Sequence, residues 1–380
     1  MKKSLITLAV MLTAVALVTV FCGPAAAKVT GVCGDCHTMH NSQDGDPTAT
    51  GGPYTALLMD DCVGCHSSSD SSPTKTIGES TVPVVYNLSK PNYNPGTLAG
   101  GNFWWVADKG GDDDAKGHNV LGISGVDSLE KAPGGFSCGG VDNCHKSLAE
   151  KQIPFPQFGS GCQGCHLRPA HHADDSDTVI GKEMYSTDGY YRFLSGHSLD
   201  PVDSGYGVCG IEDSDWQASC SAGDHNEYLG FSEEDKKEPI VSSMYTAFSS
   251  INHNTMTAFC CGCHGKFHQE KNTSGEWIRH PSDAVIPDEG EYADAFGANG
   301  TGTGIYDPLV PVARATLTSV TATVTIGGDS PDMVMCLSCH RPHGSPYDDL
   351  LRWDYGDMLA GGGSNTTGCF ACHTRKDTGS

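Results

Sequence analysis

Residues 336–343 read Cys336-Leu337-Ser338-Cys339-His340-Arg341-Pro342-His343, with two cysteines two residues apart and a histidine directly after the second. The Cys-x-x-Cys-His pattern occurs six times in this chain of 380 residues, which holds 18 cysteines and 17 histidines. It is the attachment signature of c-type haem, because two thiols add to the haem vinyl groups and the adjacent histidine is held against the iron. The six motifs are Cys33, Cys36 and His37; Cys62, Cys65 and His66; Cys162, Cys165 and His166; Cys260, Cys263 and His264; Cys336, Cys339 and His340; and Cys369, Cys372 and His373.

Cys-x-x-Cys pairs also occur in structural zinc sites and in disulfides. Zinc ribbons do not require a histidine after every second cysteine, whereas here a histidine follows all six pairs. Cysteines this close in sequence rarely form a repeated set of unstrained disulfides. The six motifs therefore predict covalent haem, with the six histidines as proximal iron ligands.

A seventh site is less regular, because Cys138 and Cys144 are separated by five residues before His145. The insertion contains two glycines, so it can bulge outward while both thiols still reach the vinyl groups. The alternative is a disulfide beside an ordinary surface histidine. We favour haem, with His145 as its proximal ligand, so the sequence predicts seven haems.

Four cysteines remain outside these seven motifs. Cys22 lies in the N-terminal apolar segment. The pair Cys209 and Cys220 lacks an adjacent histidine and is predicted to form a disulfide that closes a surface loop. Cys261 is either a buried thiol or a partner for a cysteine of another chain.

Ten histidines remain for the other face of each iron, which is enough for bis-His coordination of all seven haems. His40 and His343 lie three residues after a proximal histidine, so each is tied to one side of its own haem and must serve a neighbouring one. The same argument applies less strongly to His268 and to the pair His171 and His172. The ten are His40, His118, His171, His172, His197, His225, His253, His268, His280 and His343.

The two ends of the chain resemble each other. Tyr54-x-x-Leu57-Leu58 follows the first motif and Tyr347-x-x-Leu350-Leu351 follows the fifth, in both cases before another attachment motif. This offset suits the apolar face of a short helix lying against a haem ring. We expect a paired-haem module at each end, at residues 33–66 and 336–373.

The N-terminus and the charge balance indicate an exported protein. Two lysines, an apolar run and Ala25-Ala26-Ala27 predict a signal peptide over residues 1–27, although a lipoprotein anchored through Cys22 is an alternative. No later stretch is apolar enough to span a membrane. With 46 acidic and 23 basic side chains, the formal charge is −23, which excludes nucleic acid as a partner. We expect the protein in the periplasm, on the outer cell surface or outside the cell.

Residues 28–380 are predicted to form one region without a conventional core. Only 38% of the chain is hydrophobic, while 48 glycines and 20 prolines favour turns over the long tracts between motifs. We expect mostly irregular backbone with short helices and a few strands, wrapped around a closely packed chain of covalent haems. Alternating residues predict a strand over 320–326, and Ser232 predicts a short helix over 233–237.

The chain resembles the multihaem c-type cytochromes of metal-reducing bacteria, in which paired motifs alternate with long loops. The residues that carry the resemblance lie at 33–43, 117–120, 259–268, 277–281 and 336–345. Members of this family include outer-surface cytochromes that polymerise into conductive filaments, where some distal histidines come from the adjacent subunit. The resemblance implies that His118, His268 and His280 join His40 and His343 as distal ligands. The irregular Cys138 motif and the count of seven haems depart from the better-known filament subunits.

Coordination predicts the function. An iron bound by two histidines has no open position for a substrate, so the sequence predicts electron relay and not catalysis. Roughly 50 residues per haem are too few to keep the haems apart in a compact chain. The predicted partners are other redox proteins, an external electron acceptor, or further copies of the chain in a polymer. The alternative is a multihaem reductase with one five-coordinate catalytic haem.

Overall fold

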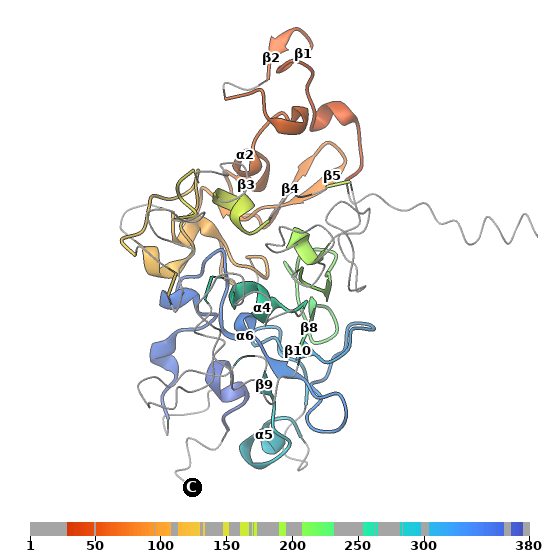
Figure 1. The fold of residues 1–380 in the computed structure, drawn as a ribbon, viewed down its shortest axis with the longest axis vertical. Coiled ribbons are helices and arrows are strands. Elements are labelled where there is room, and N and C mark those ends of the chain that lie inside the picture. Colours follow the sequence, from red (N-terminus) through yellow and green to blue (C-terminus); the bar gives the residue numbers. More distant parts are fainter. Residues whose placement is uncertain are drawn as a thin grey trace, which may run out of the picture.

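The computed structural model is a largely irregular chain with short helical turns and short strands, so the predicted fold class is confirmed (Figure 1). No described helix exceeds six residues, and no described strand exceeds four. No helix in the described part of the chain has the length and apolarity needed to cross a membrane. The structure describes residues 29–48, 51–94, 96–107, 113–129, 132–133, 147–151, 160–166, 169, 171–172, 190–194, 207–231, 254–261, 263–264, 282, 284–297, 304–360 and 366–374.

The N-terminal third is built from three two-stranded sheets and short turns. Strands β1 and β2 pair antiparallel at one end of the molecule, opposite the end where the chain terminates (Figure 1). Strands β4 and β5 form a hairpin in which Gly78, at φ +57°, supplies the first residue of the two-residue turn. The elements are η1 (Cys33–Asp35), β1 (Ser42–Gln43), β2 (Asp46–Pro47), η2 (Thr55–Leu57), α2 (Cys62–His66), β3 (Ser67–Ser68), β4 (Thr74–Ile77), β5 (Ser80–Pro83), β6 (Tyr86–Asn87), η3 (Phe103–Trp105) and η4 (Asp114–Lys116).

The rest of the chain is organised around one five-stranded sheet with the order β7-β8-β10-β11-β9. Strands β8 and β10 are parallel, and the other neighbours are antiparallel. The strands are β7 (Gly210–Ile211), β8 (Glu227–Leu229), β9 (Ala284–Val285), β10 (Ala313–Arg314) and β11 (Met333–Val334). The helical turns are η5 (Gly161–Gly164), η6 (Tyr191–Phe193), α4 (Met256–Cys261), α5 (Gly290–Ala295), α6 (Cys336–Cys339), η8 (Asp348–Leu350), η9 (Tyr355–Asp357) and η10 (Gly368–Ala371).

The apolar interior of the described residues is divided into three small clusters of four to eight buried side chains. The largest includes Tyr228, Met256 and Met335, and it packs against the attachment cysteines Cys165 and Cys260. Such small clusters bury little apolar surface for a chain of this length. Two of the clusters lie beside attachment motifs, the third is formed by Ile286, Tyr306, Val312 and Val324, and the three do not merge into a single core.

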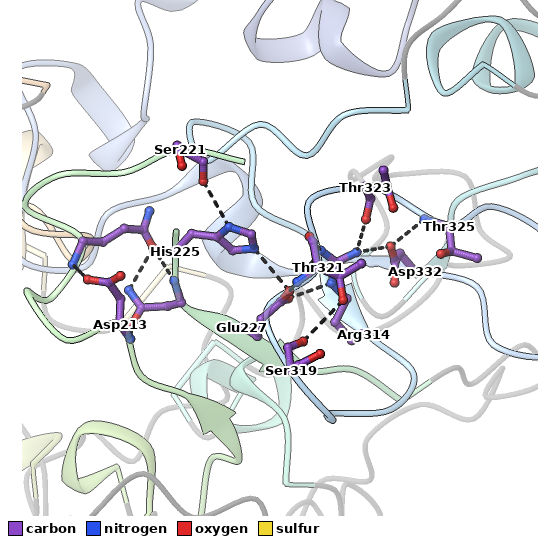
Figure 2. A network of polar contacts seen from close by, with 12 residues as sticks. Asp213, Ser221, His225, Glu227, Arg314, Ser319, Thr321, Thr323, Thr325 and Asp332 are labelled. Atoms are coloured by element: carbon purple, nitrogen blue, oxygen red, sulfur yellow. Dashed lines mark hydrogen bonds and ion pairs between the residues drawn. The ribbon is translucent and has the colours of Figure 1, made fainter. Parts of the chain in front are cut away.

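A buried ionic network joins the central sheet to the loop that follows it (Figure 2). Arg314 on β10 pairs with Glu227 on β8 (2.6 Å from Nε to Oε2) and with Asp332. The three side chains are 7%, 0% and 4% exposed. Burial alone would raise the pKa of Glu227, but hydrogen bonds from His225 and Arg314 hold that pKa below its usual value. The network therefore links β8, β10 and the segment that contains Asp332.

The same network explains why the predicted strand over 320–326 is wrong. The carbonyl oxygens of Thr321 and Thr323 accept hydrogen bonds from Arg314 at 2.8 Å, so they do not join a ladder. Only one isolated bridge forms, between Ile305 and Thr323, and Val324 is the one buried side chain in the segment. The alternating pattern of the sequence therefore marks an extended loop that caps a buried arginine.

The structure also tests two predictions about cysteines that lie outside the attachment pairs. The disulfide between Cys209 and Cys220 is wrong, because Cys209 is buried, Cys220 is exposed, and neither is disulfide-bonded. Cys261 is buried within α4, as one of its two predicted states requires. The helix predicted over 233–237 lies outside the described residues.

Candidate haem-binding sites

Each of the six regular motifs forms a single helical turn. In five of them the backbone N–H of the motif histidine donates to the carbonyl of the first cysteine, with N–O distances of 2.8–3.1 Å. Residues i, i+3 and i+4 of a helical turn lie on the same side. The turn therefore directs both thiols and the imidazole toward one side, as attachment of a haem requires. The five histidines are His37, His166, His264, His340 and His373.

The proximal imidazoles are oriented by hydrogen bonds at Nδ1. A backbone carbonyl lies 2.7–2.9 Å from the Nδ1 of five of them, so Nδ1–H donates and Nε2 keeps the lone pair that binds a metal. His373 differs, because its Nδ1 contacts the Glu291 carboxylate at 3.0 Å. The carbonyl partners are Ala56 for His37, Pro83 for His66, Arg192 for His166, Pro133 for His264 and Asp349 for His340.

Three of these carbonyls come from one repeated loop. In the two predicted modules, Tyr54 and Tyr347 begin a turn whose third residue, Ala56 or Asp349, lies at φ +56° or +58°. The predicted apolar helix face is therefore wrong, since the left-handed residue breaks the helix and turns its carbonyl toward the imidazole. Matching backbone bridges, His37 with Leu58 and His340 with Leu351, fix both loops in the same register.

A third copy of this loop was missed from the sequence. Tyr190 begins a turn in which Arg192, at φ +47°, offers its carbonyl to His166 Nδ1 at 2.7 Å. Its residues read Tyr190-Tyr191-Arg192-Phe193-Leu194, so phenylalanine replaces the first leucine of the pattern. Allowing any large apolar residue at that position would have revealed it.

Four predicted distal candidates face proximal histidines across the space of one iron. With about 2.0 Å from iron to each ring nitrogen and about 1.1 Å from that nitrogen to its ring centre, two imidazoles on one iron have centres about 6 Å apart. The described pairs match this separation. They are His37 and His172 at 6.0 Å, and His66 with His171, His118 with His264, and His166 with His343, each at 6.1 Å.

Several of the facing imidazoles have lowered pKa values, which favour the neutral form that binds iron. Burial lowers the pKa of His343 to about 3, and burial also lowers the pKa of His118 and His264. The Nδ1 of His118 is bonded to the Pro342 carbonyl at 2.7 Å, so this candidate distal ring is oriented in the same way as the proximal ones.

The prediction that His225 is a distal ligand is not supported. Its ring is fully buried and stacks on Tyr306 with centroids 3.7 Å apart. Nδ1 lies 3.2 Å from the Ser221 carbonyl and Nε2 lies 3.2 Å from Glu227, so both nitrogens face oxygen atoms of the polar network (Figure 2). The ring belongs to that network.

The other predicted site residues divide into one exposed histidine and several undescribed residues. His40 is exposed beside Met39, two residues before β1, and β1 lies at the end of the molecule opposite the C-terminus (Figure 1). The candidates that remain for His145, His340 and His373 are therefore His40, His197, His253, His268 and His280. Seven predicted site residues lie outside the described residues, namely Cys138, Cys144, His145, His197, His253, His268 and His280.

Thiols of different motifs approach one another and order the sites along a line. The strongest electrostatic interactions between thiols join Cys62 with Cys162 and Cys260 with Cys336. Weaker electrostatic contacts join Cys36 with Cys65, Cys165 with Cys260, and Cys339 with Cys369. The described motifs therefore follow one another in space in the order of the sequence.

Two buried arginines fit the carboxylates that haem carries. Arg341 and Arg352 are 4% and 3% exposed, and within the described residues neither forms a salt bridge. Arg341 Nε and Arg352 Nη1 have no hydrogen-bond acceptor. Burial and the neighbouring Arg352 lower the pKa of Arg341 to about 10. Because a buried charge requires a partner of opposite sign, this pair beside Cys339 fits the propionate groups of a bound haem.

The thiols do not fit a zinc site. Among the described residues, no three His, Cys, Asp or Glu side chains converge on a common point for a metal ion. The residues therefore fit covalent haem better than structural zinc.

Comparison with known proteins agrees with the motifs. The family model of the doubled CXXCH motif matches residues 331–378. C-type cytochrome OmcS of Geobacter sulfurreducens is 23% identical over 363 residues, which span 85% of this chain and 78% of OmcS.

Two solved structures also match this chain. The outer membrane cytochrome S filament of Geobacter sulfurreducens matches with 20% identity and a TM-score of 0.49, over 87% of this chain and 85% of that one. The OmcS nanowires of the same organism match with 19% identity and a TM-score of 0.47, over 92% of each chain.

The repeated motifs, their geometry and the sequence matches define the class. This chain is a multihaem c-type cytochrome in which residues 331–378 match the doubled CXXCH motif, and its CXXCH motifs bind haem c.

Proposed function

We propose that this chain is an exported electron relay that carries seven haems, each held between two histidines. When bound, haem supplies an iron that alternates between the ferric and ferrous states. The observation that carries the proposal is the set of four imidazole pairs with centres 6.0–6.1 Å apart. A protein that fills both axial positions leaves no site for a substrate, so electron transfer is the function that these residues support.

The spacing of the motifs supports transfer along a line. Thiols of successive described motifs interact electrostatically from Cys36 to Cys369, which supports a continuous series of attachment points. The polypeptide orients the imidazoles and places the buried charges of Arg341 and Arg352 beside the attachment motifs. The seventh haem, at Cys138 and Cys144, rests on the sequence alone.

Haem content tests the proposed count. The mass of the mature chain, together with the haem absorbance after denaturation in pyridine, should give seven haems. A variant with Cys138→Ala and Cys144→Ala should retain six and keep the fold of the rest. An unchanged haem content in that variant would remove the irregular motif from the relay.

We further propose that copies associate end to end, and that His40 of one copy completes a haem of the next. His40 is exposed at one end of the molecule, and its spacing from His37 prevents it from serving its own haem. The names of the matched structures describe OmcS as a filament and as nanowires, which agrees with this assembly.

Replacement of His40 separates assembly from folding. His40→Ala should abolish filaments in electron micrographs and leave a monomer with full haem content. Asp46→Ala, an exposed change on the neighbouring β2, should leave assembly intact. Filaments of normal length from the His40 variant would refute this role.

A multihaem reductase is the second candidate, because a relay that lacks one distal histidine leaves an iron open. Turnover of nitrite or hydroxylamine by the assembled protein, together with a high-spin ferric signal, would favour the reductase over the relay. The relay predicts that neither is observed.

A further inference from the structure

The haem site at Cys369 and Cys372 has an electrostatic environment that differs from those of the other sites. Nδ1 of its motif histidine, His373, lies 3.0 Å from Oε1 of Glu291, and the two side chains are 24% and 13% exposed. The five other described motif histidines meet backbone carbonyls. Among the described residues, this is the motif histidine that faces a charged acceptor.

Glu291 is held in place by the helix that carries it. It is the second residue of α5, where Ala293 is 1% exposed and Tyr292 packs on the buried cluster that includes Ile286 and Tyr306. Thr374 Oγ1 donates to the Glu291 carbonyl at 3.0 Å, and the Tyr292 ring contacts His373 edge-on with centroids 5.5 Å apart. The carboxylate is therefore fixed beside the imidazole.

A carboxylate acts on a metal-binding imidazole differently from a carbonyl. By accepting the Nδ1 proton in a hydrogen bond, it increases the negative character of the ring and makes Nε2 a stronger donor to iron. Its full charge also lies close to the metal in a partly desolvated position, where water screens it weakly. Both effects favour the ferric state over the ferrous state.

We propose that Glu291 is a positioning residue that makes the haem at Cys369 and Cys372 the one with the most strongly favoured ferric state among the haems of the six described motifs. This inference deepens the proposed relay function and rests on it. The site is the last of the line, next to Cys339. Because its ferric state is favoured, this haem gives up an electron readily to the neighbouring haem at Cys336 and Cys339. Electrons are therefore expected to enter the relay at the C-terminal end of the series.

The test compares isosteric and matched control variants of the full haem-loaded chain. Glu291→Gln keeps the shape and removes the charge, Glu291→Asp keeps the charge, and Thr374→Val removes a bond to the Glu291 backbone without touching the carboxylate. Haem content and circular dichroism establish that each variant is folded. Optical redox titration and ferric electron paramagnetic resonance then report on the haems.

We expect Glu291→Gln to shift one haem of the titration. At a fixed potential the ferrous-to-ferric ratio of that haem should rise at least tenfold, which corresponds to about 59 mV for a one-electron couple. One ferric resonance should change with it, while Glu291→Asp and Thr374→Val should resemble the parent protein. A titration that superimposes on that of the parent, or an equal shift of every haem, would overturn the inference.

Failure of the underlying relay would give a different result. In that case the parent protein itself would show no reversible reduction of all its haems. A reversible parent titration with an unchanged Glu291→Gln variant would contradict only the role of Glu291.

Discussion

Replacing Arg314 with methionine is expected to be among the most damaging single changes in the fold. The guanidinium donates to Glu227, to Asp332 and to the carbonyls of Thr321 and Thr323, and it is 7% exposed. Arg314→Met retains much of the side-chain volume but removes every one of these bonds. It leaves two carboxylates, 0% and 4% exposed, without their counter-charge.

The expected loss of stability follows from the burial of the two carboxylates. Breaking a buried ion pair by removing one partner costs about 3–5 kcal/mol, because the remaining charge stays desolvated. Two partners are left here, but backbone amides still bond to both, from Thr321 to Glu227 at 2.7 Å and from Thr325 to Asp332 at 2.8 Å. We therefore expect a loss of about 4 kcal/mol at pH 7.

The loss should depend on pH in a defined direction. Unpaired burial raises the folded-state pKa of Glu227 and Asp332 above their unfolded values, so both groups take up protons more readily in the folded variant. The penalty is then complete well above the raised pKa values and shrinks as the pH falls through them. The difference from the parent protein should be smaller at pH 5 than at pH 7.

Guanidinium unfolding followed by circular dichroism at both pH values measures this loss. Adding Glu227→Gln and Asp332→Asn to Arg314→Met removes the two unpaired charges. The triple variant should regain about 2 kcal/mol of the lost free energy of unfolding. A loss below about 1 kcal/mol, or a loss that is equal at the two pH values, would refute the account of a buried network.

Three further predictions concern the haem sites. His343→Ala should convert one haem from low-spin to high-spin in the ferric absorption spectrum, and added imidazole should reverse the change; an unchanged spectrum would exclude the pairing with His166. Arg341→Gln removes a buried positive charge and should lower the reduction potential of a single haem in an optical titration, whereas unchanged potentials would argue against a propionate partner. Ala56→Val places a β-branched residue at φ +56° and should lower the free energy of unfolding by about 1–2 kcal/mol, as measured by chemical unfolding. The control Thr55→Val, in the same exposed loop, should lower it little. Equal losses in the two variants would rule out backbone strain.

The sequence was sufficient where covalent chemistry demands a fixed spacing. Cys336, Cys339 and His340 must be close in sequence because they bind the same ring, so the six motifs and the irregular fold around them could be predicted. The resemblance between the two ends was also visible, since both loops carry a tyrosine and two leucines. Their backbone conformation was not, because alanine or aspartate at φ above +50° gives no compositional signal.

Contacts between residues that lie far apart in the sequence could not be predicted from motif spacing. The pairing of His66 with His171 depends on how two loops fold, and no spacing rule connects them. His225 was predicted as a ligand because a spare histidine looks the same in either role, whereas the structure places it on Tyr306 and Glu227. The alternation over 320–326 likewise suggested a strand. The sequence does not show that Arg314 bonds the carbonyl oxygens of Thr321 and Thr323 in this segment.

Near-infrared magnetic circular dichroism of the purified ferric protein tests the central claim most directly, because it reports the axial ligand pair of each haem. The measurement should be made on dispersed monomer and on the assembled form. The account predicts only low-spin bis-His signals after assembly, with any high-spin haem confined to the monomer. A high-spin haem that persists in the assembled protein would contradict a relay in which every iron lies between two histidines.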